Sequence, residues 1–337
     1  MLRIFFFLVY AIFFLLKFQT NYAYSIDYDI SKLNLTDSSV LNFKKIVLQN
    51  CESKLFFKNF REHSSYPKFG TAKNWKNVCA KLDKITFNRN FLIENFKGIS
   101  LSNKKNLLTG YYEPTIKISN TKTNIFRYPV LRYSKDLIFE RSKIYKIFKI
   151  QNVLFWTDDH IDLFFLQIQG SGIGEYKNGR KVRISYAGNN GFPYTSIGKV
   201  LIQKGYLKKE SVTLNSIKTW LRNNYNKNNE ILNKNKRYIF FKSSPLSDTG
   251  PVGAMGRNLI SNISIAIDTK IYPFGIPFIL KSDYKKYDIL AFAHDTGSAI
   301  KGFNRADLFL GRGNLAEVNA GNLKKQLLLI SLVPVTE

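Results

Sequence analysis

The 337-residue chain has little of what metal centres and nucleic-acid-binding modules require. It contains only two cysteines and three histidines, and none of His63, His160 and His294 stands at ligand spacing from a cysteine. No RNP, zinc-finger or helix-turn-helix pattern is present. We therefore expect no metal, no cofactor and no nucleic-acid partner.

Carboxylates are also scarce. Asp and Glu number 24 against 51 Lys and Arg, which gives a formal net charge of +27 at pH 7. Lysines dominate and are spread along an Asn- and Ile-rich chain rather than gathered in blocks. This pattern is typical of a compositional bias, and attraction to a polyanionic envelope or another acidic polymer is the alternative.

No apolar run is long enough to span a membrane, which takes roughly 20 residues. The longest N-terminal run, from Ile4 to Leu16, follows Arg3 and is succeeded by small or polar residues near Ala23. These features predict a signal peptide over residues 1–23 and an exported protein. An uncleaved anchor is the alternative. No cysteine lies near the cleavage region, so a lipid anchor is not expected.

In an exported protein, Cys51 and Cys79 are most simply explained as one disulfide. Both stand in helical-looking stretches, over Val40–Phe60 and Trp75–Leu82, so a bridge could join two helices. Two buried free thiols are the alternative.

From Phe91 onward the chain reads as many short strands. Alternation over residues 164–170 predicts a strand, and the glycines at 170, 172 and 174 predict a turn between strands rather than a dinucleotide loop, because no helix follows. Residues 193–205 read as one helix capped by Thr195 or Ser196, and residues 211–236 as a second. Many strands and few helices indicate β-barrel domains rather than a doubly wound sheet.

Asp295 and Asp307 stand in the segment with the richest chemistry. The sequence DTGSAIKGFNRAD, followed by LFLGRG, holds two carboxylates, Lys301, Arg305 and several glycines. An Asp at a strand end beside a glycine-rich bend is a plausible catalytic acid. An Asx-turn or a solvated Asp–Arg pair is the alternative.

Four other segments mix Gly, aromatic and hydrogen-bonding residues. They are TGYYEP at 109–114, QIQGSG at 167–172, YAGNNG at 186–191 and GPVGA at 250–254. Aromatic faces stack on sugar rings, and amides and hydroxyls suit sugar hydroxyl and acetamido groups. In an exported protein these segments favour a polysaccharide groove, although buried aromatic core explains any single Tyr.

Five segments together resemble the lytic murein transglycosylase A (MltA) family in order and approximate spacing. They are LLTGYYEP, FFLQIQGSG, YAGNNGFPYTSIGKVLI, GPVGAMG and DTGSAIKGFNRADLFLG, and the match covers about residues 90–321. The C-terminal part resembles the family's 3D domain, named for three aspartates that fall at Asp268, Asp295 and Asp307. Ser298 and the missing lipid-anchoring cysteine depart from the family pattern.

The resemblance implies a mainly β fold: a double-psi β-barrel domain with N-terminal helices, a second inserted β-barrel-like domain, and a cleft between them. The implied division is a signal peptide over 1–23, a barrel domain over 24–113 plus 239–337, and an insert over 114–238. It further implies an exolytic lyase that cleaves the MurNAc–GlcNAc bond of peptidoglycan and leaves 1,6-anhydro ends. The residues themselves leave endo or exo action open.

The family's single catalytic acid falls at Asp307. We expect a protonated Asp307 that donates to the glycosidic oxygen and then accepts the proton of the muramoyl 6-hydroxyl, with a pKa raised by apolar surroundings or by Asp295. Asp295 is expected to support it, and Arg305 to point away from it. The residues predicted to bind substrate are Thr109, Gly110, Tyr111, Tyr112, Glu113, Gln169, Ser171, Tyr186, Gly253 and Asp268, the last with a more structural role.

The expected partner is the peptidoglycan glycan strand, bound by a monomer in the periplasm or at the outer membrane or cell wall of a Gram-negative-type envelope. The envelope location also allows peripheral contact with the membrane or with cell-wall machinery. The rival hypothesis is a non-catalytic peptidoglycan-binding protein that uses the same groove. A polyanion-binding surface protein, based on the charge of +27, is the third.

Overall fold

The computed structural model describes residues 25–33, 35, 37–62, 67–85, 88–283 and 289–335. The predicted signal peptide over residues 1–23 lies outside this range. Within it, no helix combines the length and the apolar character needed to cross a membrane.

The first of two sheets closes into a six-stranded barrel. Its strand order is β14-β11-β12-β10-β13-β3, and β14 pairs with both β11 and β3, which closes the circle. Two further strands extend the sheet from β14. The strands are β1 (Ile26–Tyr28), β2 (Phe96–Ser100), β3 (Asn106–Glu113), β10 (Ser264–Ile267), β11 (Pro277–Ser282), β12 (Ile289–Thr296), β13 (Ala306–Arg312) and β14 (Lys324–Pro334).

The second sheet has six strands in the order β5-β6-β4-β7-β8-β9. They are β4 (Thr115–Ser119), β5 (Tyr128–Leu131), β6 (Val153–Thr157), β7 (Ser171–Tyr176), β8 (Lys181–Asn189) and β9 (Ile239–Pro245). Because β9 pairs with β8, residues 239–245 belong to this sheet and not to the barrel. The division into two domains stays a prediction, and the strand pairing favours a second boundary after Pro245 rather than at residue 238.

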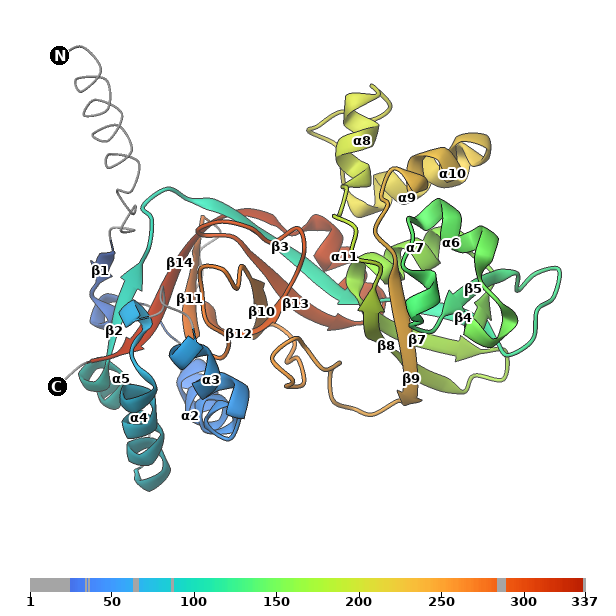
Figure 1. The fold of residues 1–337 in the computed structure, drawn as a ribbon. Coiled ribbons are helices and arrows are strands. Elements are labelled where there is room, and N and C mark those ends of the chain that lie inside the picture. Colours follow the sequence, from blue (N-terminus) through green and yellow to red (C-terminus); the bar gives the residue numbers. More distant parts are fainter. Residues whose placement is uncertain are drawn as a thin grey trace, which may run out of the picture.

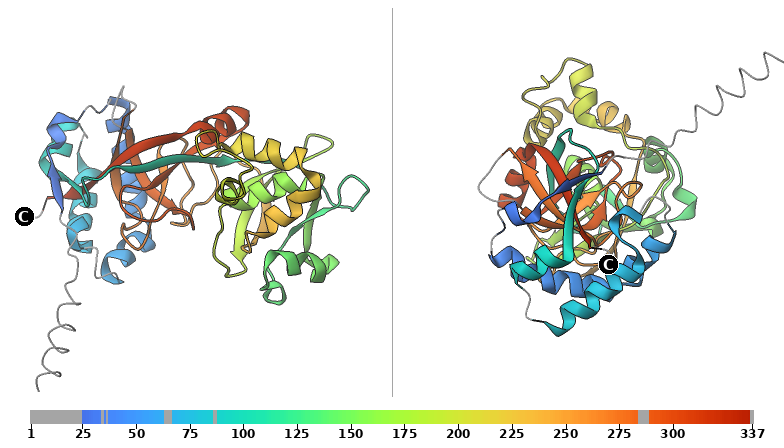
Figure 2. Two further views of the ribbon diagram at one scale, coloured as in Figure 1. Left: turned by 90° about the horizontal axis from the view of Figure 1, so that it is seen from above. Right: turned by 90° about the vertical axis from the view of Figure 1, so that its left-hand side faces the viewer.

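Helices cover the outer faces of both sheets. The N-terminal group lies against the barrel, and α11 lies beside β3 where that strand leaves the barrel for the insert (Figure 1). The views from above and from the side show an elongated molecule with the two sheets end to end (Figure 2). The N-terminal helices are α2 (Asp37–Cys51), α3 (Lys54–Glu62), α4 (Ala72–Lys84) and α5 (Arg89–Asn95), and α11 spans Asn314–Asn322.

The remaining helices belong to the insert: α6 (Arg141–Ile147), α7 (His160–Gln169), α8 (Ile197–Gln203), α9 (Leu214–Asn223) and α10 (Tyr225–Asn233). Short 3-10 turns lie at Ile30–Lys32, Pro67–Phe69, Lys135–Leu137 and Ile150–Asn152. The prediction of a mainly β fold with a barrel, a second sheet and N-terminal helices is confirmed.

The strand predicted over residues 164–170 is wrong, because these residues form the second half of α7. Asp159 caps this helix by accepting from the backbone N–H of Ile161 and Asp162, and Gly170 ends it in the left-handed conformation. Leu166 packs toward the sheet and Phe165 toward the other helices. A helix that is apolar on both sides shows no clear 3.6-residue period, and this explains the error.

Two further predictions need correction. The glycines at 172 and 174 lie inside strand β7 rather than in a turn. A Cβ at Gly172 would lie 2.6 Å from the Pro114 carbonyl oxygen, so this part of the strand requires glycine. The single helix predicted over 211–236 is two helices, α9 and α10, that meet at Asn224. The helix predicted over 193–205 is present as α8, with Ser196 as its cap.

The disulfide is confirmed. Cys51, the last residue of α2, is bonded to Cys79 in α4 with the two Cα atoms 6.1 Å apart. The bond therefore joins two N-terminal helices that pack on the barrel, and Phe43 of α2 and Trp75 of α4 are fully buried in the barrel's core.

Removing this bond is expected to destabilise the protein. The bridge closes a loop with a sequence separation of 28 residues, for which the loop-entropy relation gives a loss of roughly 3.6 kcal/mol in the free energy of unfolding. Urea unfolding of Cys51→Ser/Cys79→Ser against the oxidised wild type measures the difference. Equal unfolding free energies would show that the bond contributes no stability.

Candidate active site

Strand register aligns the two aspartates across the barrel wall. Ala266 of β10 pairs with Asp295 of β12 on one side and with Asp307 of β13 on the other, and Asp307 in turn pairs with Thr109 of β3. Residues directly opposite one another in a sheet project to the same face. Asp295 and Asp307 are therefore two strands apart on one face, at a Cα separation of roughly 10 Å.

Asp307 has one hydrogen bond and one open oxygen. The Thr109 hydroxyl donates to its Oδ1 at 2.5 Å, while its Oδ2 has no hydrogen-bond partner among the described residues. Burial raises the pKa of Asp307, with a smaller contribution from the charge of Asp295, against the opposing effects of Thr109 and Arg305. The side chain is nevertheless partly exposed. It can therefore hold a proton and reach a bound ligand.

Arg305 reaches Asp307 only through Thr109. Its Nη2 donates to the Thr109 hydroxyl oxygen at 2.9 Å, and its Nη1 donates to the carbonyl oxygens of Leu107, at 3.1 Å, and Ala306. No ion pair joins Arg305 and Asp307 in the described part of the chain. The guanidinium therefore points away from Asp307, as expected. The charge of Arg305 opposes, but does not cancel, the rise in the pKa of Asp307 that burial causes.

Asp295 is held by more donors than Asp307. Its Oδ1 accepts the backbone N–H of Ala254 at 3.0 Å, and its Oδ2 accepts the Tyr111 hydroxyl at 2.9 Å. The backbone N–H of Thr296 adds a third donor. Burial still raises the pKa of Asp295, but all three donors oppose that rise. Donors to a carboxylate favour its charged form, so Asp295 is the better placed of the two to remain ionised.

Gly253 makes room for the Ala254 donor. A Cβ at Gly253 would lie 2.6 Å from the carbonyl oxygen of His294, so only glycine lets this loop lie against β12. The predicted role of Gly253 in substrate binding is thus better described as a backbone role beside Asp295. Tyr111, predicted as a sugar contact, is 9% exposed and packs on Phe309 with ring centroids 5.3 Å apart.

Tyr112, Glu113 and Gln169 lie inside the junction between the two sheets. Gln169 accepts the backbone N–H of Tyr112 at 3.1 Å, and Tyr112 is 2% exposed. Glu113 is buried against Arg183 of β8, with 3.3 Å between its Oε1 and the arginine Nε. Burial raises the pKa of Glu113, and Arg183 opposes the rise. These three side chains help to join barrel and insert, and their contact with substrate stays a prediction.

Arg183 ties both chain crossings between the sheets. Besides Glu113 at the end of β3, it donates to the carbonyl oxygens of Thr249 and of Gly250, the latter at 3.0 Å. On the other face of β3, a pocket of about 210 Å³ is lined by Tyr112 and by Lys218, which pairs with Glu317 of α11 at 2.8 Å and Asp162 of α7 at 3.1 Å. The junction is therefore ionic on both sides.

The other predicted residues are dispersed. Gly110 lies against β13 and α11, where a Cβ would meet the Leu310 side chain at 2.7 Å and the Cα of Ala320 at 3.0 Å. Asp268 accepts the backbone N–H groups of Lys270 and Gly302 at 3.1 and 3.0 Å, which supports the structural role expected for it rather than substrate binding. Ser171 begins β7, and Tyr186 of β8 is 46% exposed.

Two contributors to the site were not predicted. The Ala254 N–H is a backbone group, so no side-chain pattern indicates it. Tyr194 lies in the loop between β8 and α8. Burial raises the pKa of Tyr194, and the charge of Asp307 raises it further. Tyr194 stands in the segment YAGNNGFPYTSIG, where its aromatic ring between Pro and Thr was the available signal.

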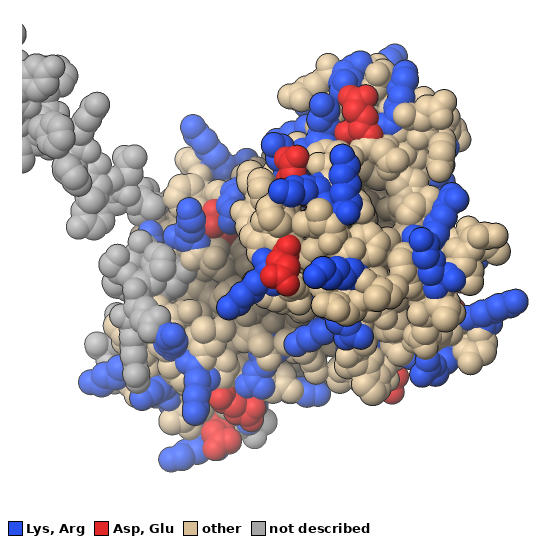
Figure 3. Space-filling model, turned by 45° about the vertical axis from the view of Figure 1, so that its right-hand side comes forward, with Lys and Arg blue, Asp and Glu red and all other residues tan. Residues whose placement is uncertain are grey.

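On the face shown in Figure 3, charge does not gather into one patch. Figure 3 shows Lys and Arg distributed over the visible face, with a few carboxylates among them. On this face the distribution agrees with a compositional bias.

Comparison with known proteins identifies the family. The family model described as the MltA specific insert domain matches residues 139–242, and the 3D domain model matches residues 263–333. A membrane-bound lytic murein transglycosylase A homolog from Buchnera aphidicola is 30% identical over 311 residues, which are 87% of this chain and 83% of that protein. The chain belongs to the lytic murein transglycosylase A family.

Other members agree. Membrane-bound lytic murein transglycosylase A of Escherichia coli K12 is 33% identical over 248 residues, which are 69% of this chain and 67% of that protein. The crystal structure of E. coli MltA with bound chitohexaose has a TM-score of 0.68 at 26% identity and covers 86% of this chain and 90% of that one. A membrane-bound lytic murein transglycosylase of Agrobacterium tumefaciens has the same fold, with a TM-score of 0.79 at 23% identity, over 92% of this chain and 97% of that one.

Replacing Asp307 with Asn is expected to stabilise the protein near neutral pH. The raised pKa of Asp307 means that the native state holds this proton more tightly than the unfolded state. Its contribution to stability is therefore complete below the unfolded pKa and is lost as pH rises through the native pKa. Asn does not ionise, so the variant escapes that loss. Melting temperatures from pH 4 to 8 test this, and a variant less stable than wild type at pH 7 would contradict it.

Proposed function

We propose that this protein cleaves the β-1,4 bond between MurNAc and GlcNAc in peptidoglycan without water and leaves 1,6-anhydroMurNAc ends. Membership of the family supports a peptidoglycan-cleaving lytic transglycosylase. The observation that supports the finer assignment is the asymmetric carboxylate pair, in which Asp307 keeps an open oxygen and Asp295 has both oxygens occupied.

The proposed reaction needs one acid that later acts as a base. Asp307 donates its proton to the glycosidic oxygen as the bond from C1 of MurNAc to that oxygen breaks. The 6-hydroxyl of the same sugar then forms a bond to C1, and its proton passes to Asp307, which restores the acid. A hydrolase would need a second carboxylate to act as nucleophile or to activate water, and Asp295, with both oxygens engaged, is poorly placed for either task.

Asp295 supports the reaction through its charge. Held as an anion by Ala254, Thr296 and Tyr111, it raises the pKa of Asp307 and so keeps that carboxyl protonated. The same negative charge favours the oxocarbenium-like transition state. Because the two groups interact, the pair titrates together, and a bell-shaped pH profile is expected, with its acid limb set mainly by Asp295 and its alkaline limb by Asp307.

The substrate is proposed to be the glycan strand. The chitohexaose bound to E. coli MltA supports an oligosaccharide ligand for the family. In this chain Tyr186 is exposed, and Tyr194 and Ser171 are partly exposed, so these groups are open to a sugar. Thr109 and Gln169 are also partly exposed. We propose an envelope location, which the membrane-bound relatives support.

Digestion of purified sacculi by wild type and Asp307→Asn tests the assignment. Mass spectrometry of the wild-type products is expected to show anhydro ends, and the Asn variant is expected to lose at least about 100-fold in rate, the usual contribution of general acid catalysis. Reducing ends would show that the enzyme is a hydrolase. Cleavage by the Asn variant at the wild-type rate would rule out Asp307, and binding without any cleavage by the wild type would favour a non-catalytic glycan-binding protein.

Replacing Thr109 is expected to move the alkaline limb of activity. The hydroxyl of Thr109 lowers the pKa of Asp307, so Thr109→Val should let the proton persist to higher pH, by roughly one to two pH units for the loss of one hydrogen bond to a charged group. Thr109→Ser keeps the hydroxyl and should retain the wild-type limb. Initial rates on sacculi from pH 4 to 9 measure it, and a downward shift in the Val variant would contradict the assignment.

A further inference from the structure

A short hairpin over residues 251–259 delivers the backbone donor to Asp295. The Leu259 N–H donates to the Pro251 carbonyl at 2.8 Å, and the Gly253 N–H donates to the Arg257 carbonyl at 2.8 Å. At its tip, Ala254 donates to Asp295 at 3.0 Å. The next N–H, of Met255, donates to the His294 carbonyl at 3.1 Å. The hairpin tip therefore lies along β12, and its position decides whether Asp295 keeps this donor.

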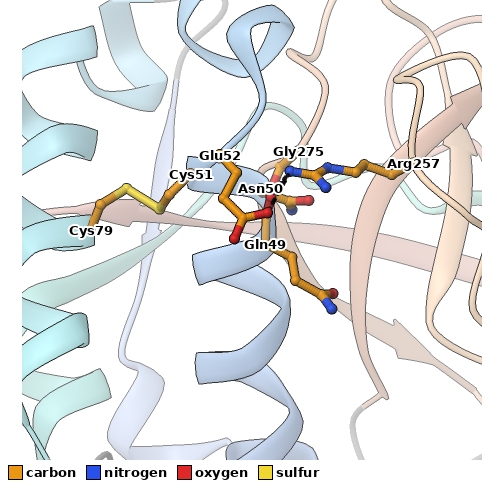
Figure 4. The surroundings of a disulfide bond; sticks show 7 residues. All are labelled: Gln49, Asn50, Cys51, Glu52, Cys79, Arg257 and Gly275. Carbon is orange, nitrogen blue, oxygen red and sulfur yellow. Dashed lines mark hydrogen bonds and ion pairs between the residues drawn. A yellow bond between two sulfur atoms is a disulfide. The ribbon is translucent and has the colours of Figure 1, made fainter.

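Arg257 fastens the hairpin to the end of α2. Its Nη2 donates to the carbonyl oxygen of Gln49 in the last turn of that helix and lies 3.4 Å from Glu52 Oε2 (Figure 4). Carbonyl groups at a helix C-terminus attract a cation. The Glu52 side chain is 72% exposed, so the ion pair with it contributes little and the hydrogen bond to the Gln49 carbonyl is the main contact.

The same turn of α2 also contacts the Gly275 turn, which packs against the hairpin. The Asn50 side chain, 1% exposed, donates to the carbonyl oxygen of Gly275 at 2.9 Å. A Cβ at Gly275 would lie 2.7 Å from the Met255 side chain, so the Gly275 turn and the hairpin are in close contact. The end of α2 therefore holds the hairpin directly through Arg257 and indirectly through Gly275.

The disulfide fixes this end of α2. Cys51 follows Asn50 directly and is bonded to Cys79 of α4 (Figure 4). A continuous set of contacts thus leads from the disulfide to Asp295. The disulfide fixes the end of α2, Arg257 joins that end to the hairpin, and the hairpin places the Ala254 N–H on Asp295.

We propose that Arg257 is a positioning residue for the carboxylate pair: by holding hairpin 251–259 on the disulfide-anchored end of α2, it keeps the Ala254 N–H on Asp295. Arg257 is not itself proposed to touch the substrate, and no contact joins it to Asp295 or Asp307 among the described residues. The proposal rests on the proposed function to the extent that Asp295 must be charged for the reaction.

Loss of the Arg257 contact should make Asp295 harder to ionise. An N–H that moves by about 1 Å from a 3.0 Å contact no longer forms a hydrogen bond, and losing a donor to the anion raises a carboxyl pKa. The other titratable groups coupled to Asp295 are Tyr111 and Asp307. His294 precedes it, and burial, with repulsion from Arg257, lowers the pKa of His294 to about 4, so that this ring is neutral above pH 5.

Arg257→Gln tests the proposal, with Glu52→Gln as the matched control. In Arg257→Gln the acid limb of the sacculus-digestion profile should move up by as much as about one pH unit, which is about a tenfold loss of rate below the optimum. The turnover number should fall while KM stays near the wild-type value. Glu52→Gln removes the exposed partner but leaves the Gln49 carbonyl, so its profile should match the wild type. Arg257→Lys keeps the charge and should recover part of the shift.

Amide hydrogen exchange gives a readout that does not depend on activity. Exchange at Ala254 should be faster in Arg257→Gln than in wild type or Glu52→Gln, measured on the native disulfide-bonded proteins. If Arg257→Gln does not fold, Arg257→Lys decides by the same two measurements. The proposal would be overturned if a folded Arg257 variant showed both the acid limb of the wild type and the wild-type rate of amide exchange at Ala254. A fully active Asp307→Asn would instead overturn the proposed function and leave the exchange result standing.

Discussion

The parallel pairing of β3 with β13 is the contact on which the site depends. Residues 198 positions apart in sequence, Thr109 and Asp307, become neighbours only because these two strands lie side by side in this register. The same strand brings Tyr111, two residues further on, to Asp295. A shift of one residue would turn both side chains to the other face. The closure of the barrel through β14, which pairs with β3 as well as with β11, fixes this register at the opposite edge of the strand.

Two carboxylates of the same type acquire different tasks from their donors. Asp295 has three donors and Asp307 has one hydroxyl, so the charged form is better stabilised at Asp295. Arg305 could have removed the difference by pairing directly with Asp307, but its guanidinium is occupied by the Leu107 and Ala306 carbonyls and by the Thr109 hydroxyl. The two backbone carbonyls therefore hold the guanidinium away from Asp307, so that an arginine and a protonatable aspartate lie in the same site.

The sequence indicated the features that depend on side-chain type and missed those that depend on backbone position. Family motifs predicted the barrel and the aspartates, and two cysteines in helical stretches predicted the disulfide. The strand predicted at 164–170 failed because α7 is buried on two sides and shows no polar face. The motif that holds Tyr112 and Glu113 predicts sugar contacts, but the sequence does not indicate that β3 leaves the barrel there and places both side chains in the junction. The Ala254 N–H had no signal, because every residue but proline has such a group.

Arg183 has a consequence for how the two sheets can move. Its guanidinium meets Glu113, where the chain first leaves the barrel, and the Thr249 and Gly250 carbonyls, where the chain returns. Both covalent crossings are thus fastened to one side chain on the insert. Moving the insert relative to the barrel would break these contacts, and on the other face of β3 it would disturb the pair between Lys218 and Glu317. A single buried arginine therefore holds both places where the chain passes between the barrel and the insert.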